Sequence, residues 1–540
     1  MPKIIRKDIA LETSPWSDSI VWYAVGVNAM MQRPITDPAS WWYFAAIHGE
    51  DIAGTDQGMP GWQNLVPPLT PPAIVWGTFK SGDPYPVMWD QCQHATWFFP
   101  PWHRGYLIAL ESQLQADIAA AGGPTNWALP YWNYWNSNGN LPVEFTQKTL
   151  PGSTGSGAAF PANLGGLPNP LYVTMRYGSA DLSNISASCL SDGVYTGALG
   201  AGFGGGSTPF IHFGSSTGDL ENNPHNIVQG DVGGQSANPP GYYGWMADPE
   251  YAALDPIFYL HHGMIDALWA FWNTGTANKN PSSAKWLNPA FPNHPGMFLM
   301  PWEPAGSGIT WQYKPQDVTN LGTLQITLSN GQSVPYTYTY DFLDNPGQAT
   351  SPFNQALQAP SSTTRLLRLG APQTLVAATT IESAEHPTEL LGASVGSVPI
   401  SNDGALVPLK LDPTTRTKLV SSFAKILSAR SPDRVFLQLE GVTGTSGASA
   451  LDVFINVPGQ AKQKVGTAGL FALRQASTPN AAHGGSGLSF GFDITQIVDG
   501  LHLASGLESG NLHVNVAPHR PIPSGKTIQI GRISVHRQAQ

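Results

Sequence analysis

The chain has 540 residues, too many for one ordinary hydrophobic core, so we expect two to four domains. Hydrophobic residues make up 41% of the chain and charged residues only 11%, which indicates a globular protein rather than a disordered one. The net charge is −10, and the sequence has no basic run of the kind that nucleic-acid binding needs. It also has no apolar stretch of the ~20 residues that would span a membrane.

The first residues, 1–8, lack the apolar core of a signal peptide and a twin-arginine pair. We therefore expect the chain as written to be cytoplasmic, and we leave export with a partner protein open. The two cysteines, Cys92 and Cys189, cannot form a disulfide framework. One bridge between them stays an alternative, but we favour two reduced residues.

The sequence pattern of the N-terminal part predicts helices joined by long loops. A helix is expected beside His103, because apolar residues recur there at helical spacing. A shorter helix is expected to begin near Pro224, and a third runs from His261 to Trp272.

The pattern changes in the second half of the chain, since all 18 tryptophans lie before residue 312. Past residue 365, short alternating strands at 435–439, 451–455, 512–516 and 528–530 predict a β-sandwich or barrel, interrupted by a helix over Pro413–Arg430. We therefore expect an N-terminal domain over 1–345, a linker over 346–364 and a β-rich domain over 365–540.

Six histidines gather in short segments of the first 262 residues and predict a transition-metal site, because neutral imidazole is the preferred ligand for copper, zinc, iron and nickel. These are His48, His94, His103, His225, His261 and His262. A helix that carries His225 presents Gln229 on the same side, and Asp266 stands four residues after His262, where its carboxylate can hold that imidazole. Neighbours on a helix point about 100° apart, so only one of His261 and His262 can face the metal, and spacing does not choose between them.

Together these segments resemble the tyrosinase and polyphenol oxidase family, the coupled binuclear copper proteins that also include molluscan haemocyanins. The matching motifs are A-A-I-H-G at 45–49, C-Q-H at 92–94, P-P-W-H-R at 100–104, H-N-I-V-Q at 225–229 and D-P-I-F-Y-L-H-H-G-M-I-D at 255–266. The resemblance covers residues 1–345. It implies a mainly α catalytic domain, in which a four-helix bundle surrounds two copper ions.

The same resemblance assigns the ligands. It implies that His48, His94 and His103 hold copper A, and that His225 and His262 hold copper B, with His261 as support. Glu221 and Asn226 match the family pair that positions a water near copper B, where the two can act as a general base for a phenol. Cys92, two residues before His94, matches members in which the sulfur is joined to the imidazole through a thioether.

One position departs from the family, because the second copper-B histidine is replaced by Gln229. An amide oxygen is a poor donor for copper(I). Copper B is then held weakly by His225, His262 and the Gln229 carbonyl, or another donor such as His212 or Asp231 fills the gap, or the chain is a variant with a weakened site. We favour the first and third alternatives.

The C-terminal region resembles the covering domain of plant-type polyphenol oxidases, which implies a lid over the copper pocket that inserts one side chain. The tyrosines at 336, 338 and 340 resemble the motif that packs on an N-terminal arginine, for which Arg6 is the candidate.

The expected activity is oxidation of phenols by O2, as ortho-hydroxylation of monophenols, oxidation of o-diphenols to o-quinones, or both. The alternatives are an o-aminophenol oxidase, a haemocyanin-like oxygen carrier and a protein whose copper site is inactive. The expected partners are small phenols and O2, neither nucleic acid nor membrane, and a homo-oligomer stays open.

Overall fold

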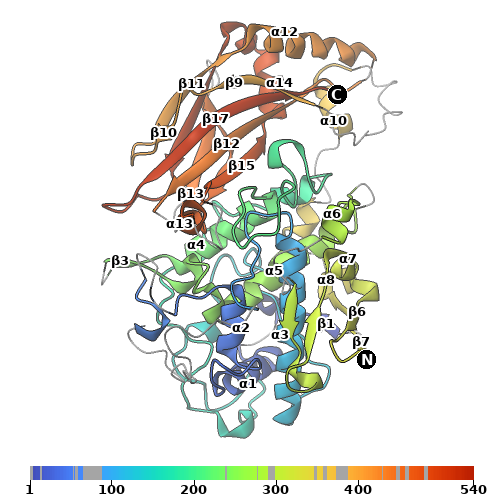
Figure 1. The fold of residues 1–540 in the computed structure, drawn as a ribbon, viewed down its shortest axis with the longest axis vertical. Coiled ribbons are helices and arrows are strands. Elements are labelled where there is room, and N and C mark those ends of the chain that lie inside the picture. The colour runs from blue at the N-terminus through green and yellow to red at the C-terminus, as the bar shows by residue number, and fades with distance from the viewer. Residues whose placement is uncertain are drawn as a thin grey trace.

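The structure in Figure 1 is a computed structural model of the chain. It describes residues 4–12, 15–52, 54, 59–64, 88–237, 240–275, 278–289, 298–345, 350–356, 362–371, 387–428, 430–445, 450–456, 461–479 and 485–540. A helical N-terminal body and a β-rich C-terminal body lie one above the other (Figure 1). Among these residues no helix has the length and apolar character needed to cross a bilayer.

The helices of the N-terminal domain pack around one core. Its main helices are α1 (Asp18–Met31), α2 (Trp41–His48), α3 (Phe99–Ala120), α4 (Ile227–Gly233) and α5 (Ile257–Trp272). The predicted helices beside His103 and after His261 are α3 and α5. The helix expected near Pro224 is divided, because a π-helical turn over Glu221–Asn226 precedes α4.

Short elements complete this domain. They are β1 (Ile4–Arg6), β2 (Gln235–Ala237), β3 (Pro240–Tyr243), β4 (Leu299–Pro301), β5 (Thr310–Gln312), β6 (Gln325–Thr327), β7 (Ser333–Pro335), β8 (Tyr338–Tyr340), α6 (Ala284–Leu287), α7 (Pro315–Val318) and α8 (Asp341–Asp344). β1 pairs in parallel with β8, which joins the first described residues to the end of the domain.

That pairing buries Arg6 among the expected tyrosines. The Arg6 guanidinium lies 2.7 Å from Glu111 and 3.2 Å from Asp266, and its centre is 3.9 Å from the Tyr338 ring. It also donates a hydrogen bond to the Tyr340 hydroxyl at 3.1 Å. The predicted packing of Arg6 on the tyrosine motif is therefore confirmed.

The C-terminal body, called the lid domain below, is one curved antiparallel sheet. Its elements are β9 (Thr388–Ala393), β10 (Val398–Pro399), β11 (Ala405–Leu411), β12 (Arg434–Gly444), β13 (Ala450–Asn456), β14 (Gln463–Gly469), β15 (Leu488–Asp493), β16 (Asn511–Pro518) and β17 (Ile528–Gln538), with the helices α12 (Pro413–Ser422), α13 (Leu473–Ser477) and α14 (Thr495–Leu503). The strand order is β14-β13-β16-β11-β9-β17-β12-β15, with β10 beside β17. The two outer strands, β14 and β15, also contact each other, so the sheet forms a nearly closed barrel. All four predicted strands are confirmed, and the predicted helix begins at Pro413 and continues past Ser422 as a 3-10 turn.

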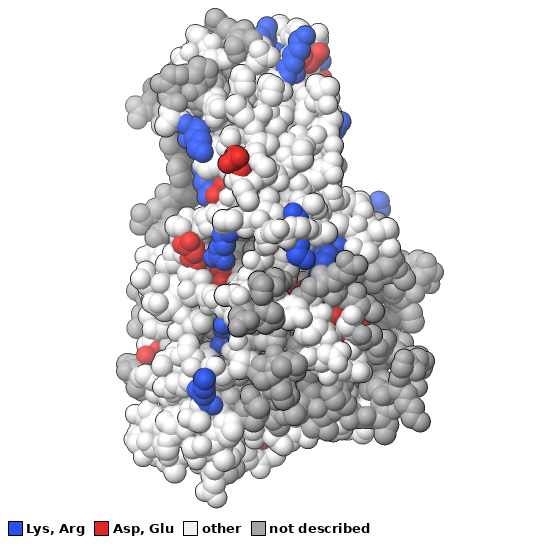
Figure 2. All heavy atoms as spheres, turned by 90° about the vertical axis from the view of Figure 1, so that its left-hand side faces the viewer, with Lys and Arg blue, Asp and Glu red and all other residues white. Residues whose placement is uncertain are grey.

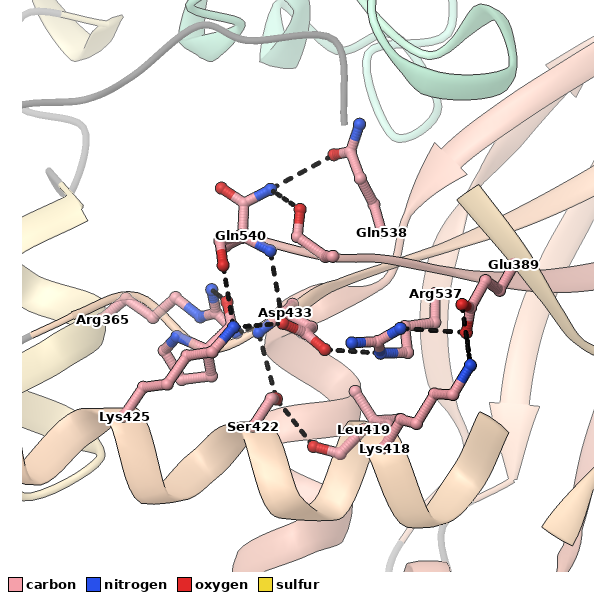
Figure 3. A network of polar contacts seen from close by, with 12 residues as sticks. Arg365, Glu389, Lys418, Leu419, Ser422, Lys425, Asp433, Arg537, Gln538 and Gln540 are labelled. Carbon is pink, nitrogen blue, oxygen red and sulfur yellow. Dashed lines mark hydrogen bonds and ion pairs between the residues drawn. The ribbon is translucent and has the colours of Figure 1, made fainter. Parts of the chain in front are cut away.

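A polar network around Asp433 fastens the end of the chain to the lid domain (Figure 3). The buried Asp433 carboxylate accepts hydrogen bonds from Lys425 at 2.9 Å and from Arg537 at 2.5 Å. Lys425 also donates to the backbone carbonyl of Gln540. The charge of Asp433 is thus paired with two cations, which removes much of the cost of burying it.

The region between the bodies is only partly a loop. It contains the short helices α9 (Phe353–Ala356) and α10 (Ser362–Arg368), and residues 346–349 and 357–361 of the expected linker lie outside the described part of the chain. Arg365 of α10 pairs with Asp499 of α14, so α10 belongs to the lid domain.

On the face drawn in Figure 2, charged side chains are few, and basic and acidic ones lie intermixed.

Arg6→Met should destabilise the protein by about 3–5 kcal/mol, because it leaves the charges of Glu111 and Asp266 buried with too few cations. The matched control is Arg33→Met, whose ion pair with Asp117 is partly exposed and should be worth about 1 kcal/mol or less. Urea denaturation measures both. Equal losses for the two variants would contradict the buried role of Arg6.

Candidate metal centre

The first ligand group combines the end of α2, the loop before α3 and α3 itself. His48, His94 and His103 are at most 2% exposed, and one ligand atom of each lies within 4.8 Å of the others and of the Cys92 sulfur. Their ring centroids are 5.1, 5.5 and 5.8 Å apart. This spacing points three imidazoles at one small volume.

Backbone carbonyls fix the tautomer of two of these rings. His48 donates from Nδ1 to the Pro249 carbonyl at 2.9 Å, and His103 donates from Nδ1 to the Phe99 carbonyl at 2.8 Å. Nε2 of each ring therefore keeps its lone pair, which is how buried metal ligands are oriented. Within the described part of the chain, Nε2 of His48 has no hydrogen-bond partner. Burial lowers the pKa of His48 to about 3, so the ring is neutral and able to bind a metal at physiological pH.

The second group joins the π-helical turn and α4 to α5. Nε2 of His225 lies 3.3 Å from Nε2 of His262, and the Gln229 amide nitrogen lies 3.4 Å from each of them. A metal ion could be held between these three side chains once the Gln229 amide is turned so that its oxygen, rather than its NH2 group, faces the two imidazole nitrogens. His225 donates from Nδ1 to the Asn226 side-chain oxygen at 2.8 Å, which leaves Nε2 for a metal.

The two groups face each other. The rings of His103 and His262 stack with centroids 4.4 Å apart and planes at 9°, and those of His94 and His225 are 5.7 Å apart. The segments at 48, 94–103, 225–229 and 262 therefore converge as predicted. The two ligand groups therefore line one common volume.

Cys92 lies against the ring of His94. Its sulfur is 3.2 Å from Nδ1 and 3.5 Å from Nε2, so it faces the ring carbon between the two nitrogens. On its other side, the His94 ring stacks on Phe213 with centroids 5.3 Å apart. Burial raises the pKa of the Cys92 thiol well above its usual value.

Phe471 of the lid domain covers both ligand groups. It follows β14, and its ring meets that of His94 at 5.3 Å and that of His225 at 5.5 Å, edge to face in each case. Phe471 is 2% exposed and belongs to the core of the N-terminal domain rather than to that of the lid domain. The predicted insertion of one lid side chain is therefore confirmed, and the residue is Phe471.

Polar contacts fix the lid on both sides of this ring. Gly469 accepts a hydrogen bond from the Asn226 side chain at 3.3 Å and donates from its backbone N–H to Asn222 at 2.8 Å. A Cβ at Gly469 would lie only 2.6 Å from the Asn226 Cβ, so this approach requires glycine. Beyond Phe471, the Arg474 guanidinium pairs with Asp248 at 2.5 Å.

Comparisons with known proteins agree with this geometry. Residues 38–275 match the family model described as the common central domain of tyrosinase, and residues 387–538 match a domain of unknown function, DUF7868. Tyrosinase HcTyr1 of Hahella sp. (strain CCB-MM4) is 30% identical over 532 residues, which span 96% of this chain and 97% of that protein. The chain belongs to the tyrosinase family.

More distant relatives resemble the chain in part or in fold. The latent chloroplastic polyphenol oxidase of Prunus armeniaca is 30% identical over 210 residues, 37% of this chain and 33% of that protein. The structure of latent apple tyrosinase aligns with 99% of this chain and 98% of its own, with a TM-score of 0.54 and 18% identity. That of latent aurone synthase gives a TM-score of 0.55 at 15% identity and covers 100% and 90%. These structures support the two-body fold.

The family holds a binuclear copper centre, and the chain is a copper-dependent oxidoreductase that acts on phenols. The first ligand group fits copper A, because three buried neutral imidazoles form it and Nε2 of His48 is available. The second group fits copper B with two imidazoles and one amide. The side-chain oxygen of Gln229 has no partner among the described residues, so turning the amide would make it available to a metal at no loss of a hydrogen bond to that oxygen.

The structure corrects the expectation for Asp266. It does not hold His262: its carboxylate accepts hydrogen bonds from Arg104 at 2.5 Å and from the hydroxyls of Tyr338 and Tyr340 at 2.6 and 2.5 Å. The spacing of four residues does place Asp266 on the same face of the helix as His262. Cations and phenol hydroxyls, however, stabilise a buried carboxylate better than a neutral imidazole does. Nδ1 of His262 has no hydrogen-bond partner in the described part of the chain.

The two candidate replacements for the missing histidine lie elsewhere. His212 donates from Nδ1 to the Cys92 carbonyl at 2.7 Å, beside copper A. Asp231 pairs with Arg520 of the lid domain at 2.7 Å. Neither belongs to the ligand group of His225 and His262, whereas His261 does.

The expected catalytic pair, Glu221 and Asn226, lies in the π-helical turn that also carries His225. Glu221 accepts a hydrogen bond from the Ala95 N–H at 2.6 Å, and its second oxygen has no partner among the described residues. Burial raises the pKa of Glu221 well above its usual value. The Asn226 side chain accepts a hydrogen bond from Nδ1 of His225 and donates one to the Gly469 carbonyl of the lid domain.

Sequence reasoning missed two contributors. Phe471 stands in a short apolar run directly after a strand and resembles an ordinary core residue. A glycine two residues earlier, at a strand end, is the signal that could have marked a close approach. Pro249 acts through its backbone carbonyl, for which a sequence carries no signal.

Phe471→Ala should raise the rate at which the full-length protein oxidises a small phenol by roughly tenfold or more. Burying such a ring stabilises the docked lid by about 1.5–3 kcal/mol, so its loss favours the open pocket. The control is Phe454→Ala, a lid position where Lys462 lies 4.1 Å over the ring, outside the pocket. Initial rates measure both, and unchanged rates for Phe471→Ala would show that this ring does not limit access.

Proposed function

We propose that the chain oxidises o-diphenols to o-quinones with O2 and also hydroxylates monophenols at the ortho carbon. Balanced, a monophenol and O2 give an o-quinone and water, and two o-diphenols and one O2 give two o-quinones and two waters. The observation that carries the proposal is the facing of the two ligand groups, with stacked rings 4.4 Å apart. When bound there, the copper ions would supply dioxygen binding and electron acceptance.

The position of Phe471 indicates where a phenol ring would bind. Its aromatic ring is in contact with the edges of His94 and His225, and a substrate of the same shape fits once the lid has moved. Opening the lid would also free the Asn226 amide from Gly469. Asn226 could then hold a water together with the available oxygen of Glu221.

Glu221 would receive the phenol proton through that water. A carboxylate whose pKa is raised by burial is a stronger base when ionised, which brings it closer to the phenol it must deprotonate. The bond from Ala95 to its other oxygen fixes the orientation of the carboxylate. Glu221 and Asn226 are thus assigned as the general-base pair, and Gln229 as a copper-B donor through its side-chain oxygen.

Glu221→Gln should lower kcat/KM for a monophenol by about 100-fold or more while the copper content stays unchanged. The control is Glu144→Gln, a buried carboxylate that accepts a hydrogen bond from the Trp16 backbone. Oxygen uptake and trapped quinone are measured with phenol, catechol and o-aminophenol. Oxidation of o-aminophenol alone would indicate an aminophenol oxidase, and reversible O2 binding without quinone would indicate a carrier and overturn the proposal.

We also infer a thioether between Cys92 and His94, because the sulfur already faces the ring carbon at nitrogen distances of 3.2 and 3.5 Å. Forming the C–S bond breaks the S–H bond and a ring C–H bond and releases two protons and two electrons, which O2, the co-substrate proposed above, would accept. Copper-loaded protein should then have a mass lower by two hydrogen atoms. After denaturation and reduction, alkylation should modify Cys189 only, which serves as the internal control. A second alkylated site at Cys92 in fully active protein would exclude the link.

A further inference from the structure

Copper B has an incomplete set of imidazoles. Copper A has three, whereas the positions matched by the family give copper B only His225 and His262, with Gln229 between them. An amide oxygen is a harder and weaker donor than imidazole for copper(I), the state that must bind O2. A further nitrogen donor would therefore change the properties of this ion.

His261, which the family resemblance gives only a supporting role, is a buried imidazole. It is 0% exposed, and neither ring nitrogen has a hydrogen-bond partner among the residues that the structure describes. Leaving a buried polar group unpaired costs about 1–3 kcal/mol, so such a ring points to a ligand. Its ring lies 5.8 Å from that of Tyr134 on the far side.

The spacing of this ring matches that of a ligand. The centroid of His261 lies 5.3 Å from those of both His225 and His262, and these two lie 4.9 Å apart. The three copper-A rings are separated by 5.1, 5.5 and 5.8 Å. One ligand atom of each of His225, His261 and His262 lies within 4.8 Å of the others.

We propose that His261 supplies the third imidazole to copper B, with the Gln229 amide as an additional, weaker donor. The inference rests on the proposed copper site. Neighbouring residues on a helix diverge, so the His261 nitrogen has to move. The ligand atoms lie within 4.8 Å of one another, so reaching the 3.3 Å found between His225 and His262 needs a shift of at most about 1.5 Å, which side-chain rotation can supply.

The test measures copper rather than activity. Each purified protein is loaded with copper(I), dialysed against a chelator and analysed for copper per chain, and the affinity of the second ion is measured by chelator competition. The variants are His261→Gln, Gln229→Ala and Gln229→His. The control is His502→Gln, a lid histidine whose ring stacks on Phe423.

The wild type, Gln229→Ala and His502→Gln should keep two coppers, and His261→Gln should bind the second at least tenfold more weakly. Wild-type affinity in His261→Gln, or loss of the second copper in Gln229→Ala, would overturn the proposal. Should His261→Gln not fold, Gln229→Ala still tests the proposal, because loss of its second copper would show that no donor other than Gln229 completes the site.

The wild type also separates this inference from the function proposed above. If it holds a single copper and Gln229→His restores the second, His261 does not complete copper B, and the inference fails while the enzyme assignment stands. If no variant, including Gln229→His, binds two coppers, the binuclear function itself fails.

Discussion

Burial of uncharged imidazoles is the constraint on which the site depends, and His48, His103 and His225 are also directed by a hydrogen bond at Nδ1. Water is excluded, so protonation is unfavourable, and the pKa values of His48 and His225 fall to about 3. A carbonyl or amide oxygen can only accept a hydrogen bond, so its contact with Nδ1 leaves Nε2 as a donor to the metal. The surrounding fold therefore prepares the ligands before any ion binds.

The helices that carry these rings are tied to each other by charge. Arg104 directly follows His103, and it pairs at 2.5 Å with Asp266, which lies one turn after His262. Both side chains are almost completely buried, so breaking the pair would leave a charge in an apolar environment. This pair sets the register of α3 against α5, and with it the facing of the copper-A and copper-B ligands.

Much of this could be predicted from the sequence, because ligand motifs and strand alternation are local signals. The convergence of the histidine segments, the packing of Arg6 on the tyrosines and the β-rich lid domain were all predicted correctly. The prediction that Asp266 holds His262 was wrong, because helical spacing shows which face a residue occupies but not which partners compete for it there. The identity of Phe471 and the placement of His261 depend on distant segments packing together, and spacing along the chain does not encode that.

Asn226 links the docked lid domain to the second ligand group. One end of its amide accepts a hydrogen bond from His225, and the other donates to Gly469 of the lid domain. Hydrogen bonds in such a chain polarise one another, so docking strengthens the hold on His225 and makes its Nε2 a better donor. Coupling of this kind is reciprocal. An ion bound at His225 would therefore favour the docked lid, and a substrate that displaced Phe471 would also loosen the contact between Asn226 and Gly469.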